Sequence, residues 1–538
     1  MTTAQLKKFD KNDWLIGFGL VIATALSRIP FVSRMIYEGD SVRFALAMEH
    51  YDVAQMRPHA PGYILYIALA KLADFFIHDA AISLAGISII SSALTIVFIY
   101  SLANDMYGRS TGIISSLILL SSPLFWFNGE MPLTYALEGS VSVIFGFVCY
   151  RLIIGEKKWL LISAIVLAIA TGVRQNIVIL LLPLWLYALK SSSLKQIFIS
   201  FFFFGLVCLS WLVPMIALTG GVQSYFEALN AQFNTVVLSP APFLWQIKIR
   251  GQIFSKFMVY SLWLGSIPLL YYLGRYFRLS TIASNRRLIF LLLWFFPAVV
   301  FFIGVNVYNP GHVIVILPPL MILLSEAIRQ SSIDLTNGLK KLTTAGLFNL
   351  KGHLKSIFSY SAILASVVIF ITSINSYIFL FSHTRVSYAS IKESDYRLSN
   401  FVTLTREVFT PANSIILAFF HSTQATFYLP DYMIYCPFPL MFSPSDVPLE
   451  AQNVYISFRR QTSPKRYWIP TGFQIEPISL PPKIDTVIVW EKNIAGYYQH
   501  PTRPLREIKS KTSDTKIYFF NIKPEEKIIY DYHYLSIK

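Results

Sequence analysis

Long apolar runs separated by short polar stretches fill the chain from about residue 14 to about residue 381. A helix needs about 20 apolar residues to cross a bilayer, and eleven runs approach that length. They lie at 14–32, 80–103, 112–128, 133–153, 158–173, 175–189, 196–218, 256–274, 287–304, 312–329 and 357–381. The pattern predicts a polytopic α-helical membrane protein with about eleven transmembrane helices.

A further apolar run, residues 62–77, decides on which side every later loop lies. If this run does not cross, the basic residues gather in the cytoplasmic loops and the opposite loops hold few, as the positive-inside rule requires. The basic residues then assigned to the cytoplasm are Lys7, Lys8, Lys11, Arg109, Arg151, Lys157, Lys158, Lys190, Lys195, Arg275, Arg278, Arg286, Arg287, Lys340, Lys341, Lys351 and Lys355. We therefore predict an interfacial helix at 62–77, a cytoplasmic N-terminus and an extracytoplasmic C-terminus.

This predicted topology places most of the polar residues that are candidates for a functional site on the external face of the membrane. The external loops are 33–79, 128–135, 171–176, 219–255, 308–312 and everything after 382. The loop at 219–255 carries large apolar residues at helical spacing, which predicts a second interfacial helix that Pro240 and Pro242 end. The spaced residues are Tyr225, Phe226, Leu229 and Phe233.

From about residue 383 the composition becomes mixed and short strand-like runs appear. These runs are SIILAFF (414–420), YMIYC (432–436), VYISF (454–458), DTVIVW (485–490) and KIYFFNI (516–522). The segment HSTQATFYLP between the first two is typical of a helix. We therefore predict a transmembrane domain at 1–382 and a small extracytoplasmic α/β domain at 383–538.

Composition agrees with a membrane protein. Hydrophobic residues make up 54% of the chain and charged residues 14%, and the net charge of +16 comes from basic residues scattered between apolar runs. That scatter excludes the basic stripe expected of a nucleic-acid partner. The three cysteines lie far apart, and the chain has no Asp-x-Asp, P-loop or glycine-rich dinucleotide motif. A disulfide framework, a zinc cluster and a magnesium-held nucleotide donor are therefore disfavoured.

The first external loop holds the strongest candidate for an active site, the polar stretch EGDSVRFALAMEHYDVAQMRPHAPGY at 38–63. Asp40 can act as a base there, although Asp40 or Ser41 can equally cap the helix that follows. Asp52 is a second acid of the loop. His59 precedes a Pro-Gly turn at the start of the interfacial helix, where either an anion or the lipid headgroups are suitable partners.

Three further charged residues lie near external helix ends. Glu130 is either an active-site acid or a solvated loop carboxylate, and Glu138 lies inside the next apolar run, where an acid is functional or paired with a polar neighbour. Arg174 is an arginine on the face that should be poor in arginine. It either snorkels to the interface or binds phosphate oxygens with its fork of donors.

Several of these segments together resemble a known family. They are SRIP (27–30), EGDSVRFALAM, RPHAPGYILYIALAKL, SSPLFWFNGEMPLTYALEG and TGVRQNIVILLLPLW. The chain over residues 14–330 resembles bacterial membrane glycosyltransferases of the GT-C superfamily, in the branch related to protein O-mannosyltransferases and the aminoarabinose lipid A transferase. That resemblance implies transfer of a sugar, with inversion, from a polyprenyl-phosphate carrier to an acceptor hydroxyl outside the membrane, usually without a metal or other cofactor.

The resemblance also implies roles for single residues. Asp40 matches the first-loop acid that acts as base, and His59 stands where relatives often carry a lysine. Arg174 and, more weakly, His312 fall where relatives hold the carrier phosphate. Relatives often carry paired acids in the first loop, whereas Ser41 follows Asp40 here, so a second acid has to be Glu130, Asp52 or none.

Two other functions fit the pattern less well. A transporter or a lipid-linked sugar flippase would place polar residues at the bilayer midplane, whereas this chain gathers them at one surface. A glycan ligase with a pyrophosphate donor would need more external arginine and histidine. We therefore expect a polyprenyl-phosphate sugar as donor, a lipid, glycan or protein as acceptor, and a bacterial inner membrane as the location.

Overall fold

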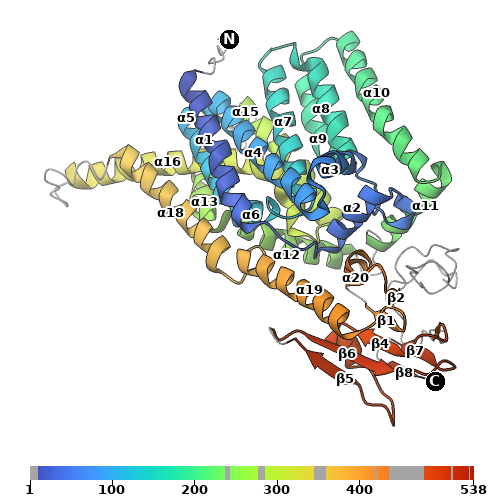
Figure 1. The fold of residues 1–538 in the computed structure, drawn as a ribbon. Coiled ribbons are helices and arrows are strands. Elements are labelled where there is room, and N and C mark those ends of the chain that lie inside the picture. Colours follow the sequence, from blue (N-terminus) through green and yellow to red (C-terminus); the bar gives the residue numbers. More distant parts are fainter. Residues whose placement is uncertain are drawn as a thin grey trace. The chain divides into compact units, whose positions relative to one another are not determined.

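The computed structural model describes residues 10–236, 243–276, 285–344, 359–418, 421–435, 478–510, 513–531 and 534–537. Contacts divide the chain into two compact units, each built from segments far apart in the sequence. Unit 1 comprises Met1–Val32, Tyr63–Pro214 and Phe243–Ser390, and unit 2 comprises Ser33–Gly62, Met215–Pro242 and Ile391–Lys538. The start of the first external loop, which we assigned to the transmembrane domain, thus groups with the C-terminal residues (Figure 1).

Unit 1 is a bundle of helices. Its elements are α1 (Lys11–Arg28), η1 (Ile29–Phe31), α3 (Ile64–Ile77), α4 (Ala80–Tyr107), α5 (Arg109–Ser121), α6 (Pro123–Asn128), α7 (Tyr135–Ile153), α8 (Trp159–Val173), α9 (Ile177–Leu189), most of α10 (Leu194–Leu218), α12 (Phe243–Leu262), η3 (Trp263–Gly265), α13 (Ser266–Tyr276), α15 (Arg286–Gly304), η4 (Pro310–Ile316), α16 (Leu317–Thr344) and α18 (Tyr360–Phe381). The long helices α4 and α7 pack against each other, and α3 packs on α4 and α8.

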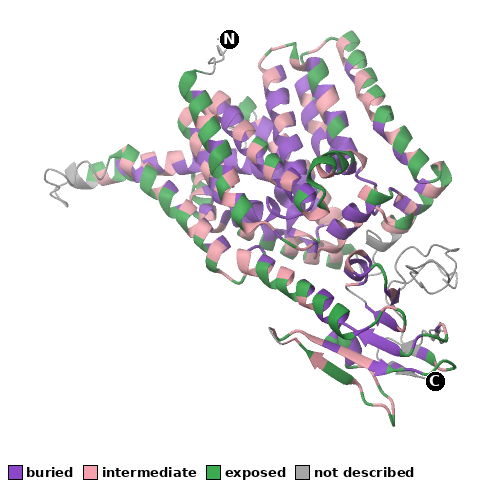
Figure 2. Cartoon of the chain, viewed as in Figure 1, coloured by how far each residue is buried: buried purple, intermediate pink, exposed green. Residues whose placement is uncertain are grey.

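Eight stretches of helix in the described residues are long and apolar enough to cross a membrane, and α5, α8 and α9 are shorter apolar helices. Together they account for the eleven predicted runs, although a count of eleven crossings stays a prediction. Helix α3, with 14 residues, is shorter than the 20 or so that a crossing needs. Outer helices such as α10 and α18 expose apolar side chains along much of their length (Figure 2), which suits contact with lipid.

One end of unit 1 collects charged residues that we predicted to be cytoplasmic. Nε of Arg109, at the start of α5, lies 2.9 Å from Oδ1 of Asp13 near the start of α1. Arg151, near the end of α7, contacts Asp105 near the end of α4 at 2.6 Å. These helix ends therefore lie on the same side of unit 1, as the predicted membrane topology requires. Which side faces the cytoplasm stays a prediction.

Two predicted boundaries in unit 1 are wrong. The run at 112–128 is two helices, because Pro123 lacks an amide hydrogen and starts α6 instead of continuing α5. The expected loop at 219–255 contains α11 (Val222–Val236), as predicted, but α12 begins at Phe243 inside it. Arg250, inside α12, is buried and donates from Nη1 to the Gly304 carbonyl at 2.8 Å.

Unit 2 is an α/β assembly. Its helical elements are α2 (Gly39–Glu49), η2 (Val53–Gln55), α11, most of α19 (Tyr388–Val408), α20 (Ser422–Tyr428) and α21 (Lys492–Ala495). Its strands are β1 (Ser414–Leu417), β2 (Met433–Tyr435), β3 (Ile478–Ser479), β4 (Thr486–Val489), β5 (Arg506–Lys509), β6 (Lys516–Asn521), β7 (Lys527–Asp531) and β8 (Tyr534–Ile537). A five-stranded sheet has the order β2-β1-β4-β6-β5, and a three-stranded sheet has the order β3-β7-β8.

The larger sheet is parallel across β2, β1 and β4 and antiparallel from β4 to β6 and β5. Strands β1 and β4 are buried on both faces, which is why their sequences are continuous apolar runs. Ile416 and Ile488 face one apolar core with Phe401 of α19, while Ile415 and Val487 face the other. The predicted strands β1, β2, β4 and β6 and the helix α20 are confirmed. The predicted strand at 454–458 lies outside the described residues.

Candidate functional site

Asp40 lies in the first turn of α2, in unit 2. The N-cap of α2 is Glu38, and no side chain caps this helix end, so neither Asp40 nor Ser41 is the cap. The Asp40 side chain is 40% exposed, and its Oδ1 lies 3.3 Å from Nη1 of Arg43 and 3.6 Å from Nδ1 of His59. Asp40 is therefore a reachable carboxylate beside two basic side chains, and a helix N-terminus also favours its charged form.

His59 lies in the turn that leads from unit 2 into α3. Its side chain is 8% exposed and packs near the Phe44 ring, with 5.6 Å between centroids. Two tyrosine hydroxyls hold the turn: Tyr51 donates to the Gly62 carbonyl at 2.7 Å, and Tyr225 of α11 donates to the Pro61 carbonyl at 3.1 Å. A side chain at Gly62, where φ is +121°, would collide with the Tyr51 hydroxyl. The turn therefore fixes His59 against Asp40.

The second acid of the first loop has a structural contact. The Asp52 side chain accepts a hydrogen bond from the Ala54 amide at 2.9 Å and so caps η2. The backbones of Asp52 and Arg57 also pair with each other. Asp52 thus shapes the loop before His59.

Unit 1 contains a separate polar cluster at the junction of α7, α8, α9 and η4. Nη1 of Arg174 lies 3.0 Å from Oε1 and 3.1 Å from Oε2 of Glu138, and Nη2 lies 3.2 Å from Nε2 of His312. The Thr134 hydroxyl donates to Oε1 of Glu138 at 2.6 Å. Glu138 lies 36 residues and His312 lies 138 residues from Arg174 in sequence. The three side chains form one hydrogen-bonded group, which we call the Arg174 cluster.

Aromatic rings enclose the Arg174 cluster. The Arg174 guanidinium carbon lies 5.6 Å from the centroid of Tyr135 and 5.9 Å from that of Tyr63. The His312 ring stacks on Phe302 at 6.1 Å. Burial lowers the pKa of Arg174, but the Glu138 carboxylate and the neighbouring tyrosine hydroxyls together hold it above its ordinary value. Arg174 therefore stays a cation in this partly buried cluster.

The sequence before His312 allows this packing. Asn309 caps η4 by accepting from the Gly311 amide at 3.0 Å. A Cβ at Gly311 would approach the Tyr135 ring to 2.1 Å, so only glycine fits beside that ring. The motif YNPGH therefore places His312 between Tyr135 and Phe302, next to Arg174.

Glu130 is fully buried in unit 1, between α6 and α7, and is not the solvated loop carboxylate that one alternative required. Its principal charged neighbour is Arg28 of α1, which is also fully buried. Burial raises the pKa of Glu130, although the Arg28 guanidinium and the Trp126 indole pull it down. Arg28 itself donates to the Leu120 carbonyl at 2.8 Å. The catalytic role of Glu130 stays a prediction. Both of its carboxylate oxygens are buried without a hydrogen-bond partner among the described residues, and Arg28 acts on it only through its charge.

An apolar groove of about 740 Å³ lies between α9 and α15 of unit 1. It is lined by Ile179, Ile289, Leu292, Leu293, Phe296, Pro297, Val300, Phe301, Gly304 and Val305. The lining residue Phe301 contacts Phe302, with 5.9 Å between ring centroids, and Phe302 stacks on His312. Helix α9, which supplies Ile179, begins three residues after Arg174. The groove lining is thus adjacent in sequence to residues at the Arg174 cluster, both at Phe302 and at the start of α9.

The predicted site residues therefore form two groups and one outlier. Asp40 and His59 meet in unit 2, and Arg174 and His312 meet in unit 1. Glu130 is buried apart from both groups, with Arg28 as its principal charged neighbour. Sequence reasoning missed Arg43 beside Asp40 and the partnership of Glu138 with Arg174. The first could have been found, because Arg43 is three residues after Asp40 on the same helix. The second needs the packing of α7 on α8 and α9.

Comparisons with known proteins find a family model that matches part of the chain and solved structures with a similar fold. A protein-family model described as dolichyl-phosphate-mannose-protein mannosyltransferase matches residues 58–218, which include His59, Glu138 and Arg174. The crystal structure of ArnT from Cupriavidus metallidurans bound to undecaprenyl phosphate is similar, with a TM-score of 0.57 and 13% identity over 95% of this chain and 98% of that chain. No curated protein matches the chain by sequence.

Two further structures are similar. ArnT from Cupriavidus metallidurans in the apo state has a TM-score of 0.57 and 14% identity over 94% of this chain and 97% of that chain. The arabinosyltransferase EmbB from Mycobacterium smegmatis has a TM-score of 0.41 and 12% identity over 74% of this chain and 42% of that chain. At these identities the ArnT structures show a shared fold over nearly the whole chain.

Proposed function

This chain has the fold of the GT-C membrane glycosyltransferases, and we propose that it transfers a sugar from a polyprenyl-phosphate carrier to an acceptor hydroxyl, with inversion. The acceptor is a lipid, a glycan or a protein on the external face of a bacterial inner membrane. The fold and the match to a mannosyltransferase family model support the reaction class. The undecaprenyl phosphate bound to ArnT supports the class of carrier.

The Arg174 cluster is the observation that carries the proposal. A sugar that leaves a polyprenyl phosphate returns negative charge to the phosphate oxygens, and cations or hydrogen-bond donors that stabilise this charge speed the reaction. The Arg174 guanidinium is permanently charged, and its donors match phosphate oxygens. Contact with Glu138 and His312 fixes its orientation before the donor binds, so little reorganisation remains for the reaction.

The apolar groove supports a lipid-linked donor over a soluble one. A polyprenyl tail is a long hydrocarbon, and burying apolar surface contributes about 25 cal/mol per Å². The groove between α9 and α15 is almost entirely apolar, and its lining residue Phe301 contacts Phe302, which stacks on His312. In the proposal the tail lies along this groove while its phosphate contacts Arg174 and His312.

Asp40 supplies the base. The acceptor hydroxyl must lose a proton as its oxygen bonds to the anomeric carbon, and a carboxylate in reach of that oxygen accepts the proton. The Asp40 side chain is partly exposed, and its Oδ1 lies 3.3 Å from Nη1 of Arg43 and 3.6 Å from Nδ1 of His59. The bond from the anomeric carbon to the phosphate oxygen breaks, and the carrier leaves as polyprenyl phosphate.

The proposal needs no metal ion. Arg174 and His312 offer positive charge and hydrogen bonds where a nucleotide-dependent enzyme would use magnesium. In the proposal Arg174 and His312 stabilise the leaving group, and Asp40 accepts the proton.

The test is direct transfer by the purified protein. Synthetic polyprenyl-phosphate sugars should be incubated with the protein and with candidate acceptors, and the release of polyprenyl phosphate followed. Mass spectrometry of surface glycans and of lipid-linked sugars, in cells with and without the gene, identifies the sugar and the acceptor. We expect loss of one glycan and accumulation of its lipid-linked precursor. Unaltered glycans together with absent transfer in vitro would refute the proposal.

A further inference from the structure

Five residues of unit 2, Ser33–Tyr37, connect η1 to α2 without helix or strand; we call them the arm. Amides in such a segment have no regular backbone partners and must be satisfied in another way. The arm amides bond mainly to side chains of the C-terminal part of unit 2. The amides of Arg34 and Met35 donate to the Asp395 carboxylate at 2.7 and 3.0 Å, and the Ile36 amide donates to the Tyr428 hydroxyl at 2.7 Å.

Asp395, on α19, is the centre of these contacts. It also accepts from the Ser33 hydroxyl at 2.8 Å, so one carboxylate receives three hydrogen bonds from three consecutive arm residues. Burial raises the pKa of Asp395, whereas the hydrogen bonds from Arg34, Ser33 and Met35 pull it down. A carboxylate that loses hydration in this way depends on the arm donors to replace the lost water.

The contacts continue along the arm to the start of α2. Nε2 of Gln424 in α20 donates to the Tyr37 carbonyl at 2.6 Å. At the next turn, a Cβ at Gly39 would lie 3.7 Å from the Thr423 hydroxyl, so α20 also touches the first turn of α2. Asp40 follows Gly39 directly. Helices α19 and α20 therefore hold the backbone on the N-terminal side of Asp40 from residue 33 to residue 39.

Apolar packing reinforces the hydrogen bonds. Ile36 is fully buried. Met35 and Tyr37 pack against the core that α19, α20 and the larger sheet share, beside Phe401 and Leu429. The arm is thus a component of the C-terminal fold, although it precedes that fold by more than 350 residues in sequence.

We propose that the C-terminal part of unit 2 positions the catalytic loop, with Asp395 as the principal positioning residue. This inference rests on the proposed function, in which Asp40 is the base. Asp395 does not contact the substrate in this proposal. It holds the arm so that α2 presents Asp40 in one orientation, and a base displaced by about 1 Å loses much of its effect on turnover.

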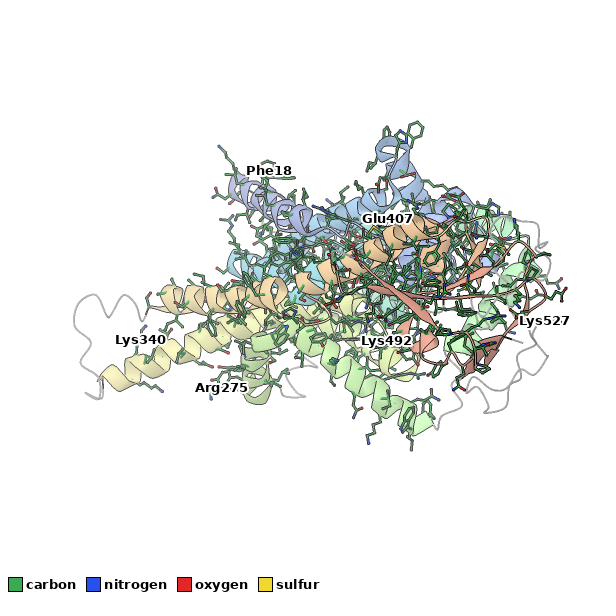
Figure 3. The ribbon with its side chains drawn as sticks, turned by 60° about the horizontal axis from the view of Figure 1, so that its bottom comes forward. Phe18, Arg275, Lys340, Glu407, Lys492 and Lys527 are labelled. Carbon is green, nitrogen blue, oxygen red and sulfur yellow. The ribbon has the colours of Figure 1, made fainter. Side chains whose placement is uncertain are left out.

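The experiment uses full-length protein in detergent and three variants. Asp395→Ala removes the acceptor of three hydrogen bonds, and Tyr428→Phe removes the acceptor of the Ile36 amide. Glu407→Ala is the matched control, because Glu407 is an exposed carboxylate on the same helix α19 (Figure 3). Hydrogen–deuterium exchange of the arm amides is measured together with kcat and donor KM, both expressed per folded molecule.

We expect arm amides to exchange about tenfold faster or more in Asp395→Ala, and kcat to fall by about tenfold with donor KM within about twofold. Tyr428→Phe should change both quantities in the same direction by less, and Glu407→Ala should match the wild type. A merely structural Asp395 would lower the yield of folded protein and leave kcat per folded molecule unchanged. Unchanged exchange, or faster exchange with wild-type kcat, would overturn the inference.

The exchange measurement also separates this inference from the proposed function. A wild-type protein that transfers no sugar would refute the proposed function and the catalytic part of the inference with it. The exchange rates of the arm amides would still confirm or refute the hold of Asp395 on the arm, because they need no donor.

Discussion

Arg174 and Glu138 compensate each other's charge inside unit 1, with Nη1 of the arginine 3.0 Å from Oε1 and 3.1 Å from Oε2 of the glutamate. Removing one partner of a buried pair costs about 3 to 5 kcal/mol, because the other charge is left without compensation. The pair also means that a donor phosphate competes with Glu138 for the guanidinium. Glu138 therefore restrains the affinity for phosphate as it orients Arg174.

The first prediction separates these two effects. In Arg174→Ala/Glu138→Gln no buried charge is left alone, so the fold should survive, and binding of the polyprenyl-phosphate sugar should weaken by about 1.5 to 3 kcal/mol. Glu138→Gln alone keeps the cation and should bind the donor as tightly as the wild type or more tightly. Donor affinity is measured by titration in detergent. Equal affinity of the double variant and the wild type would return Arg174 to a structural role.

The second prediction concerns Asp40. Because Asp40 is not the N-cap of α2, Asp40→Asn removes a charge and a base without removing a cap. The variant should fold, bind donor normally and lose about 10²-fold or more in turnover. Asp52→Asn is the control, since Asp52 caps η2 in the same loop. Turnover is measured with a synthetic polyprenyl-phosphate sugar, and a nearly normal rate for Asp40→Asn would move the search for the base to Glu130.

The third prediction concerns Glu130. If the electrostatic interaction of Glu130 with Arg28 is structural, Glu130→Gln leaves a fully buried guanidinium uncompensated and should lower stability by about 3 to 5 kcal/mol. Arg28→Met/Glu130→Gln should recover part of that loss, because the remaining buried charge is then removed. Thermal unfolding in detergent distinguishes the cases. A Glu130→Gln variant with normal stability and strongly reduced turnover would instead identify a catalytic acid.

Most helices could be predicted because an apolar run as long as a bilayer is thick almost always forms a helix. The errors occur where a single residue changes where a helix begins or ends. Pro123 divides a continuous apolar run. Helix α12 carries Arg250 within the predicted loop, and only the fold supplies the Gly304 carbonyl that accepts from its guanidinium. Strand β5 was missed because it is an exposed strand at the sheet edge with charged residues at Arg506, Glu507 and Lys509.

The sequence allowed us to predict which residues belong to the candidate site, but not which of these residues contact one another. Asp40, His59 and Arg174 attract attention because charge near an apolar helix end is costly. Their partners depend on packing that no local pattern contains. His312 reaches Arg174 because Gly311 lets the chain pass close to Tyr135, and Glu130 meets Arg28 across about 100 residues of sequence.

The fourth prediction is the side of the membrane. Arg109 and Arg151, which we assigned to the cytoplasm, share one end of unit 1 with the start of α1, so the C-terminus should be extracytoplasmic. A reporter that fluoresces only in the cytoplasm should be dark when fused after Lys538. A second fusion, in the segment between α16 and α18, serves as the bright control. A bright fusion at Lys538 would contradict the predicted membrane topology.

The fifth prediction concerns metal removal. Because Arg174 and His312 take the role of a cation at the phosphate, sugar transfer should continue at its normal rate after dialysis against a strong chelator. The comparison is a magnesium-dependent glycosyltransferase treated in the same way, which should stop. Activity that is lost on chelation and restored by magnesium or manganese would show that the proposal lacks a metal site.

Unit 2 joins residues from the beginning, the middle and the end of the chain. The segment with Asp40 is synthesised early, whereas Asp395, Gln424 and Tyr428, which hold its arm, emerge only after the last apolar helix. During biosynthesis the arm amides therefore cannot form these hydrogen bonds until the C-terminal residues have been synthesised. A chain cut short after α18 would carry the predicted transmembrane segments and still lack the contacts that hold the residues before Asp40, so sugar transfer should require α19 and α20.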